Sequence, residues 1–201
     1  MSHAHEVNAF GALAVEVADR VQKAGNPHGA SVPAALAALH GLAAGQSIDS
    51  LARVVGLSHS GAVRLVDRLS EAGFAERRMG ADGRAVALQL TPEGRRAARR
   101  VLAQREAAIE QVLAPLTSSE RATLARLHER LIASLTTSQQ ERRRVCRLCD
   151  VDACGRDCPG EQANRRLEGY TAIVARSIRA ATTSDQPSPI ERTRSALARW
   201  S

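Results

Sequence analysis

Residues 48–94 read IDSLARVVGLSHSGAVRLVDRLSEAGFAERRMGADGRAVALQLTPEG, and this stretch decides the fold. Its first half predicts two short helices that meet at Gly56, because glycine accepts the left-handed conformation in which many helices end. Asp49 is suited to cap the first helix and Ser58 the second. Helical spacing predicts that each helix buries one apolar face, formed by Leu51, Ala52, Val55, Val63, Val66 and Leu69, with Leu65 close to it.

The second half changes from helical to strand-like patterning after Gly73. Phe74–Arg78 and Val86–Leu90 flank the turn-rich Gly80–Gly83, which predicts a β-hairpin. Thr91-Pro92-Glu93 then supplies a capping hydroxyl, a proline and an acid for the start of a new helix. Two helices followed by a hairpin form the winged helix-turn-helix plan. We therefore predict a mainly α fold with a small β-hairpin wing.

The second helix of this plan fits the major groove of duplex DNA, where its outward side chains reach base edges. The candidates on or near its outer side are His59, Ser60, Ala62, Arg64, Leu65 and Arg68. Arginines of the hairpin would lie beside the groove, where phosphates attract cations. The chain is predicted to bind double-stranded DNA.

Composition agrees with a DNA-binding protein. The 201 residues carry a net charge of +7, which favours polyanions as partners, and Lys23 is the only lysine among 28 basic residues. Aromatic residues make up only 2%, so the core must be built from Leu, Val, Ile and Ala. No apolar run approaches the roughly 20 residues of a membrane helix, and the N-terminus lacks the regions of a signal peptide. A cytoplasmic protein with no membrane partner is expected.

The ordered set of short motifs resembles the MarR family of bacterial transcription regulators. The matching pieces are Ile48–Ala52, Val54–Ser58, Val63–Leu69, Ala72–Phe74, Arg77-Arg78, Asp82–Arg84 and Leu90–Gly94. The resemblance covers about residues 6–140. It implies that Asp82 braces the wing, that Arg84 contacts DNA, and that Arg77 or Arg78 helps to bind phosphates. The alternative for Arg77 and Arg78 is that they only solvate an edge strand. Asp67 is expected to pair on the helix surface with Arg64 or Arg68.

The resemblance also implies a homodimer that reads a pseudo-palindromic operator, acts as a repressor and responds to a small-molecule effector. The alternative is that the long flanking helices pack within one chain. The predicted organisation is an N-terminal dimerisation helix in residues 1–32, the winged helix-turn-helix domain in 33–91, dimerisation helices in 92–141, a cysteine segment in 142–160, a C-terminal helix in 161–183, and a linker and tail in 184–201.

All four cysteines, Cys146, Cys149, Cys154 and Cys158, stand in the spacing C-x2-C-x4-C-x3-C, outside the family pattern. Clustered thiols in a cytoplasmic protein more often bind metal or sense redox state than form disulfides. The spacing begins like a zinc knuckle, and its C-x3-C-Pro ending is that of bacterial ferredoxins. We predict a metal site with zinc slightly preferred; the alternatives are an iron–sulfur cluster and, last, a metal-free thiol switch. The metal would act as a structural staple or as a sensor next to the dimerisation helices.

Other functions find less support in the sequence. No Ser/His/Asp grouping, phosphate loop or pair of acids stands out, so the chain is predicted not to be an enzyme. A redox or electron-transfer protein would not need the winged domain. A zinc-knuckle RNA binder would need aromatic residues interleaved in the cysteine segment, and these are missing. The run Arg142–Arg144 and Arg147 are expected to form a solvated helix end.

Overall fold

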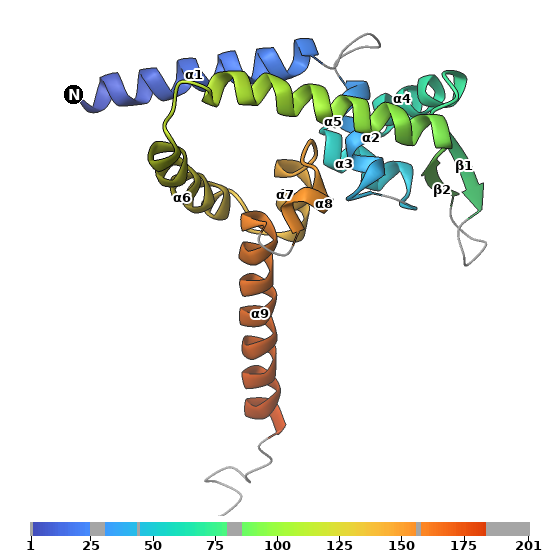
Figure 1. Cartoon of the computed structure of the whole chain (residues 1–201). Helices are drawn as coiled ribbons and strands as arrows, with labels where there is room; N and C mark the ends of the chain where they lie inside the picture. Colours follow the sequence, from blue (N-terminus) through green and yellow to red (C-terminus); the bar gives the residue numbers. More distant parts are fainter. Residues whose placement is uncertain (1, 25–30, 44, 80–85, 156–157, 184–201) are drawn as a thin grey trace, which may run out of the picture. The chain divides into compact units, whose positions relative to one another are not determined.

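The computed structural model describes residues 2–24, 31–43, 45–79, 86–155 and 158–183 (Figure 1). The chain divides into two units, residues 1–164 and 165–201. The first unit holds α1 to α8 and the start of α9 (Pro159–Thr183), and the second holds the rest of α9. Along the described residues, no helix combines the length and the apolar character that crossing a membrane requires.

A winged helix-turn-helix unit, called the head below, consists of three helices and a two-stranded antiparallel sheet. Its elements are α2 (Ser31–His40), α3 (Ile48–Val55), α4 (His59–Glu71), β1 (Ala75–Met79) and β2 (Val86–Leu90). In the register of the sheet, Ala75 faces Leu90 and Met79 faces Val86. This arrangement confirms the predicted fold class, a mainly α protein with a small β-hairpin wing.

The core of the head is aliphatic, as the composition predicts. Its most deeply buried large side chains, each at most 1% exposed, are Leu51, Val54, Leu65, Val66, Leu69 and Leu88. Residues 32–39 of α2 are all buried, which explains why this helix carries no polar stripe. Val55 is half-buried and packs against this core, in agreement with the inward face predicted for α3, whereas Val63 of α4 is only half-buried.

The helix caps of the head agree with the sequence at three of four positions. Gly56 ends α3 with a φ of 74°, and Ser58 begins α4 by accepting a hydrogen bond from the Gly61 N–H at 3.2 Å. Ser47 caps α3 in place of the predicted Asp49, accepting from the Ser50 N–H at 3.3 Å. Ser47 has extended backbone geometry and lies one residue before the helix. Its hydroxyl is therefore in the position that accepts a hydrogen bond from an unpaired amide of the first turn. Thr91 caps α5 (Pro92–Leu113) as predicted. Pro33 is the third residue of α2 and lies in the first turn, where no intrahelical amide donor is needed.

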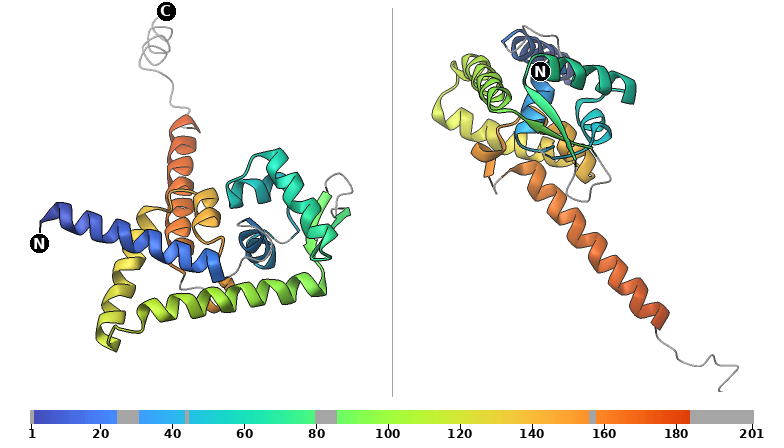
Figure 2. Two further views of the ribbon diagram at one scale, coloured as in Figure 1. Left: turned by 90° about the horizontal axis from the view of Figure 1, so that it is seen from above. Right: turned by 90° about the vertical axis from the view of Figure 1, so that its right-hand side faces the viewer.

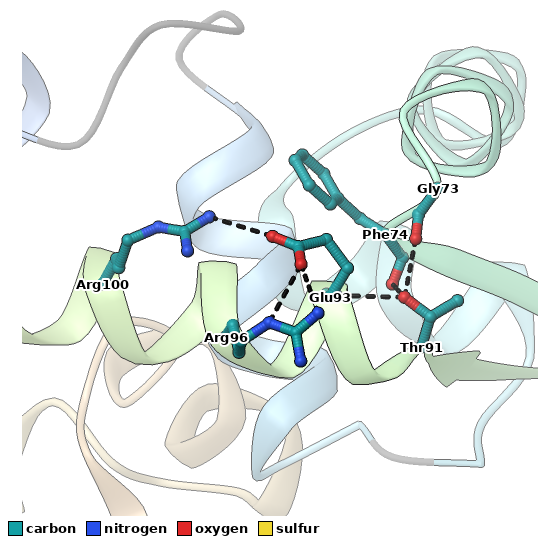
Figure 3. A network of polar contacts seen from close by, with 7 residues as sticks. Gly73, Phe74, Thr91, Glu93, Arg96 and Arg100 are labelled. Carbon is teal, nitrogen blue, oxygen red and sulfur yellow. Dashed lines mark hydrogen bonds and ion pairs between the residues drawn. The ribbon is translucent and has the colours of Figure 1, made fainter.

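A hydroxyl joins the wing to the next helix, α5 (Pro92–Leu113) (Figure 3). The Thr91 hydroxyl donates to the Gly73 carbonyl at 2.6 Å and accepts from the Gly94 N–H at 3.0 Å. A Cβ at Gly94 would lie 1.8 Å from the Phe74 carbonyl oxygen, so only glycine lets α5 approach this closely. Hydrogen bonds from the guanidinium groups of Arg96 and Arg100 hold the pKa of Glu93 below its ordinary value.

Long helices flank the head. α1 (His3–Ala24) lies along α5, as the two ribbon figures agree (Figures 1 and 2). α6 (Ser118–Ser134) begins with the predicted capping box, in which Thr117 and Glu120 exchange hydrogen bonds. These hydrogen bonds from Thr117 lower the pKa of Glu120. α1 contains no buried residue, although its sequence is amphipathic.

The region around the cysteines is helical rather than irregular. It contains α7 (Gln139–Val145), α8 (Val151–Cys154) and the start of α9. Ser138 caps α7, and the Asp150 carboxylate caps α8 by accepting from the amides of Asp152 and Ala153 at 3.0 and 3.1 Å. The predicted linker and tail, residues 184–201, lie outside the described residues.

Candidate nucleic-acid interface

The outer face of α4 is polar and accessible. His59, Ser60, Arg64 and Arg68 are exposed, while the opposite face of the helix is in the core. Ala62 and Leu65, two further candidates for DNA contact, are fully buried at 0% exposure, so that part of the prediction was wrong. Their positions follow the helical period of Val66 and Leu69, which places them on the inward stripe.

His59 does not stand free on this face. Its Nδ1 lies 2.6 Å from the Asp49 carboxylate of α3, although both side chains are more than 60% exposed. The contact joins the first helix of the motif to the start of the second. Asp49 thus orients an exposed side chain of α4. The two residues are ten positions apart in the chain, so local spacing did not indicate this contact.

The guanidinium groups of Arg64 and Arg68 have no ion-pair partner among the side chains that the structure describes. Two unpaired cations therefore lie one turn apart on the exposed side of α4. Such a pair is suited to bind phosphate oxygens or the O6 and N7 acceptors of guanine.

The wing arginines are already paired with acids. Arg77 Nη2 lies 2.7 Å from Asp67 Oδ1, and Arg78 lies 2.7 Å from Glu76. The prediction that Asp67 pairs with Arg64 or Arg68 was wrong, because the β1 strand brings Arg77 next to the outer side of α4. Asp82 and Arg84, the predicted brace and DNA contact of the wing, lie outside the described residues.

The four cysteines form a second group of chemically active side chains. All four are free thiols; Cys146 is buried and Cys154 is exposed. The Cys146 thiol donates to the Cys149 sulfur, and this bond, helped by the Arg105 and Arg147 cations, lowers the pKa of Cys149 to about 6. The same contact and burial raise the pKa of Cys146. Burial and the neighbouring Cys158 raise the pKa of Cys154 to about 11.

The thiols are close to one another but do not point to one centre. Among the residues that the structure describes, no group of three or more His, Cys, Asp or Glu side chains is arranged to hold a metal ion. The zinc or iron–sulfur site predicted from the spacing therefore stays a prediction.

Two arginines before the cysteines join this segment to the rest of the first unit. Arg142 pairs with Glu161 at 3.2 Å and is only 13% exposed, and Arg143 donates to Gln46 Oε1 at 2.8 Å. Arg143 also lies 3.5 Å from the Ser50 hydroxyl of α3. The prediction of a solvated helix end was wrong for these two residues. The sequence pattern could not predict the contact between Arg143 and Gln46, because these residues are 97 positions apart in the chain.

Replacing Arg143 with methionine should lower the free energy of unfolding by about 1–3 kcal/mol, because a charged donor is lost while most of the stem is kept. The expected loss is toward the lower end of this range, because the buried Arg143 Nε already has no partner. Urea denaturation measures the change. Arg144→Met is the matched control: Arg144 is exposed, so its change should stay within about 0.5 kcal/mol. Equal losses in both variants would contradict the contact.

A hollow of about 640 Å³ opens beside the cysteines. It lies between α2, α5 and α8, and its walls include His40, Arg99, Leu102, Arg105, Cys149 and Cys154. The hollow is open to solvent on one side and carries apolar, cationic and acidic groups, the acids being Glu106, Asp150 and Asp152. It shows that the cysteine segment faces α5, the helix that follows the wing.

Comparison with known proteins shows the fold. A MarR family protein from Bacillus stearothermophilus aligns with a TM-score of 0.60 at 21% identity, over 66% of this chain and 94% of that protein. MepR, a transcription regulator of the Staphylococcus aureus multidrug efflux pump MepA, aligns with a TM-score of 0.55 at 14% identity, over 67% and 99%. The reduced form of MarR from E. coli gives 0.51 at 22%, over 60% and 94%. No family model and no curated protein sequence matches the chain.

Proposed function

Because the chain has the fold of solved MarR family proteins, we propose that it is a sequence-specific, double-stranded DNA-binding transcription regulator. The observation that carries this proposal is the outer face of α4. It presents His59, Ser60, Arg64 and Arg68 to solvent on a helix that is fixed by a fully buried inner face. Such a helix fits the major groove, and its exposed cations supply the attraction to phosphates.

We propose that two copies of the chain bind one pseudo-palindromic operator. Support comes from apolar side chains that one chain leaves in solvent. In α1, Val7, Phe10 and Leu13 are 53–61% exposed, and in α6, Leu127 and Leu131 are each 46% exposed. Amphipathic helices normally bury such side chains, and a second copy would cover them. A two-fold dimer places its two reading helices about one turn of DNA apart.

Repression is the mode of action that we propose, since a bound dimer excludes other proteins from the duplex that it covers. The small-molecule effector and the cytoplasmic location stay predictions. The competing readings are a zinc-knuckle RNA binder and a redox protein, and the DNA-binding experiment separates them from a regulator.

The test begins with selection of a duplex from a random pool by the full chain, followed by fluorescence anisotropy at several salt concentrations. Arg64→Ala and Arg68→Ala should each weaken binding roughly 5- to 150-fold, the effect of about 1–3 kcal/mol per specific base contact. Arg77→Ala should weaken binding less, because DNA must first displace Asp67 from this arginine.

The matched control is Arg176→Ala, which removes the same charge from an exposed position on α9. Its affinity should change less than threefold, by an order-of-magnitude allowance for long-range charge effects. If both α4 variants bind like this control, α4 is not the reading helix. If the protein binds single-stranded RNA as tightly as any duplex, or more tightly, the result would support a zinc-knuckle RNA binder instead.

A further inference from the structure

Two short helices, α7 and α8, and the start of the long helix α9 bring the four cysteines of the chain together. Cys146 follows α7, Cys149 lies in the turn after it, Cys154 ends α8 and Cys158 precedes α9. Their thiols contact one another in a chain, from Cys149 to Cys146, from Cys146 to Cys158 and from Cys158 to Cys154. Cys146 is only 5% exposed, and a Cβ on Gly160 would lie 3.2 Å from its sulfur. Every thiol of the chain belongs to this one connected group.

We propose that these four thiols bind one zinc ion, and that the bound ion holds the cysteine segment, residues 142–160, against the DNA-binding head. Four thiolates in a small loop are the donor set that a soft, tetrahedral dication prefers. The metal-binding half of the proposal stands by itself. The half that concerns DNA affinity rests on the proposed function.

The fold of the segment explains why an ion is needed there. α7 has seven residues and α8 has four, and helices of this length are not stable without support. Among the described residues between 142 and 160, only Cys146 is a buried apolar side chain, so this part has almost no core of its own. Small units of this kind are commonly held by a metal ion or by disulfides, and the four cysteines are free thiols.

Two nearby cations favour an anionic centre, and one carboxylate, that of Asp150, opposes it. Zinc with four thiolates carries a net charge of −2, and the cations of Arg105 and Arg147 act on Cys149. Arg105 comes from α5 and Arg147 from the segment itself. The Asp150 carboxylate is occupied as the cap of α8, so it does not compete as a ligand.

Binding requires a local change of side chains. A zinc ion needs each sulfur at about 2.3 Å, so the thiols must turn from their mutual contacts toward one centre. Cys154 has room for this movement, because it is exposed and is followed by Gly155 with a φ of 56°. A change of χ1 between staggered rotamers redirects a thiol.

The cysteine segment packs directly against the head. Arg143 reaches Gln46 and Ser50 at the start of α3, and Leu148 packs against the aliphatic core. Val151 of α8 lies against Gly41, where a Cβ would be 2.8 Å from its side chain. A loaded centre would therefore hold α3 in place, and α3 positions α4 through the Asp49–His59 contact.

The first test measures metal binding alone. Full-length protein, stripped with chelator under anaerobic conditions, is titrated with Co²⁺ and followed by visible absorption, and protein as purified is analysed for metals. We expect the intense sulfur-to-cobalt bands of a tetrahedral thiolate site and zinc at about one ion per chain. Absence of the cobalt bands in the folded, reduced protein would overturn the site. A brown protein with iron and sulfide would overturn the choice of zinc.

Variants then assign the ligands. Cys154→Ser, at the most exposed position, should weaken cobalt binding and change its bands, and replacement of all four cysteines with serine should abolish both. Val151→Ala is the matched control, because it loosens the contact with Gly41 but keeps every thiol; it should bind cobalt like the parent chain. Unchanged metal content in the four-serine variant would overturn the proposal even if other variants fail to fold.

The second test concerns DNA. With the duplex selected above, removal of zinc should weaken binding by a factor on the order of 5 to 150, and re-addition should restore it. An unchanged affinity would overturn the coupling while leaving the metal site intact. Failure of the chain to bind any duplex would overturn the proposed function instead, and the cobalt result would still decide the site.

Discussion

Gly94→Ala should destabilise the head by at least about 3 kcal/mol, the upper range for overpacking a well-packed position. The new Cβ would lie 1.8 Å from the carbonyl oxygen of Phe74, which is backbone and cannot rotate away. Relief requires the start of α5 to move away from Gly73 and Phe74. That movement would break the hydrogen bond from the Thr91 hydroxyl to the Gly73 carbonyl (Figure 3) and the one from the Thr91 amide to the Phe74 carbonyl. For a chain of this size, the melting temperature should fall by roughly 6–12 °C.

Differential scanning calorimetry of the two proteins measures this shift. Gly11→Ala is the matched control, because Gly11 is also in a helix interior but has nothing within 4 Å of its added Cβ. Helix propensity predicts that this variant is more stable by about 0.5–1 kcal/mol. If Gly94→Ala melts at or above the parent temperature, α5 does not approach the wing as described.

The double change Phe10→Asp and Leu13→Asp should convert a dimer into a monomer. These side chains are 61% and 53% exposed in one chain, and they share one face of α1 with the half-buried Val17 and Val21. Two carboxylates in an apolar interface would lose their water without gaining partners, at a cost of several kcal/mol. Changes at an interface act mainly by raising the rate of dissociation, which weakens the dimer. The monomer should therefore dominate at micromolar concentrations.

Light scattering after size-exclusion chromatography gives the mass of each variant. Val15→Asp is the control, since Val15 is 64% exposed but lies on a different face of α1. It should leave the mass at twice that of one chain. A parent protein that runs as a monomer, or a double variant that stays dimeric, would contradict the proposed assembly. Loss of the dimer should also weaken operator binding, because each half-site would then be bound independently.

The sequence was a good guide wherever a local rule determines the structure. Gly56, Ser58, Thr91 and the Thr117–Glu120 box act in the structure as their motifs predict, because each depends on residues within one turn. The β-hairpin wing was found from the change of period after Gly73. These features are sufficient for the fold class, and the fold class is sufficient to place the exposed face of α4.

Predictions failed where a distant partner decides. Asp49 looked like a cap but binds His59, and Asp67 looked like a helix-surface partner but binds Arg77 of the wing. Leu65 was counted both as core and as DNA-facing, and only packing against the other elements of the head resolves it as core. In each case several local partners were chemically acceptable. The tertiary arrangement determines the actual partner, and residue spacing in the sequence does not carry that information.

The bond between Arg143 and Gln46 also has a consequence for synthesis. The ribosome releases α3 well before Arg143 emerges, since the two bonded residues are 97 positions apart. Domains fold largely in the order in which they leave the ribosome. A nascent chain would thus form the winged helix-turn-helix head first, and the bond from Arg143 to Gln46 would form only after the cysteine segment has emerged. Premature termination before residue 143 would therefore release heads that lack this hydrogen bond.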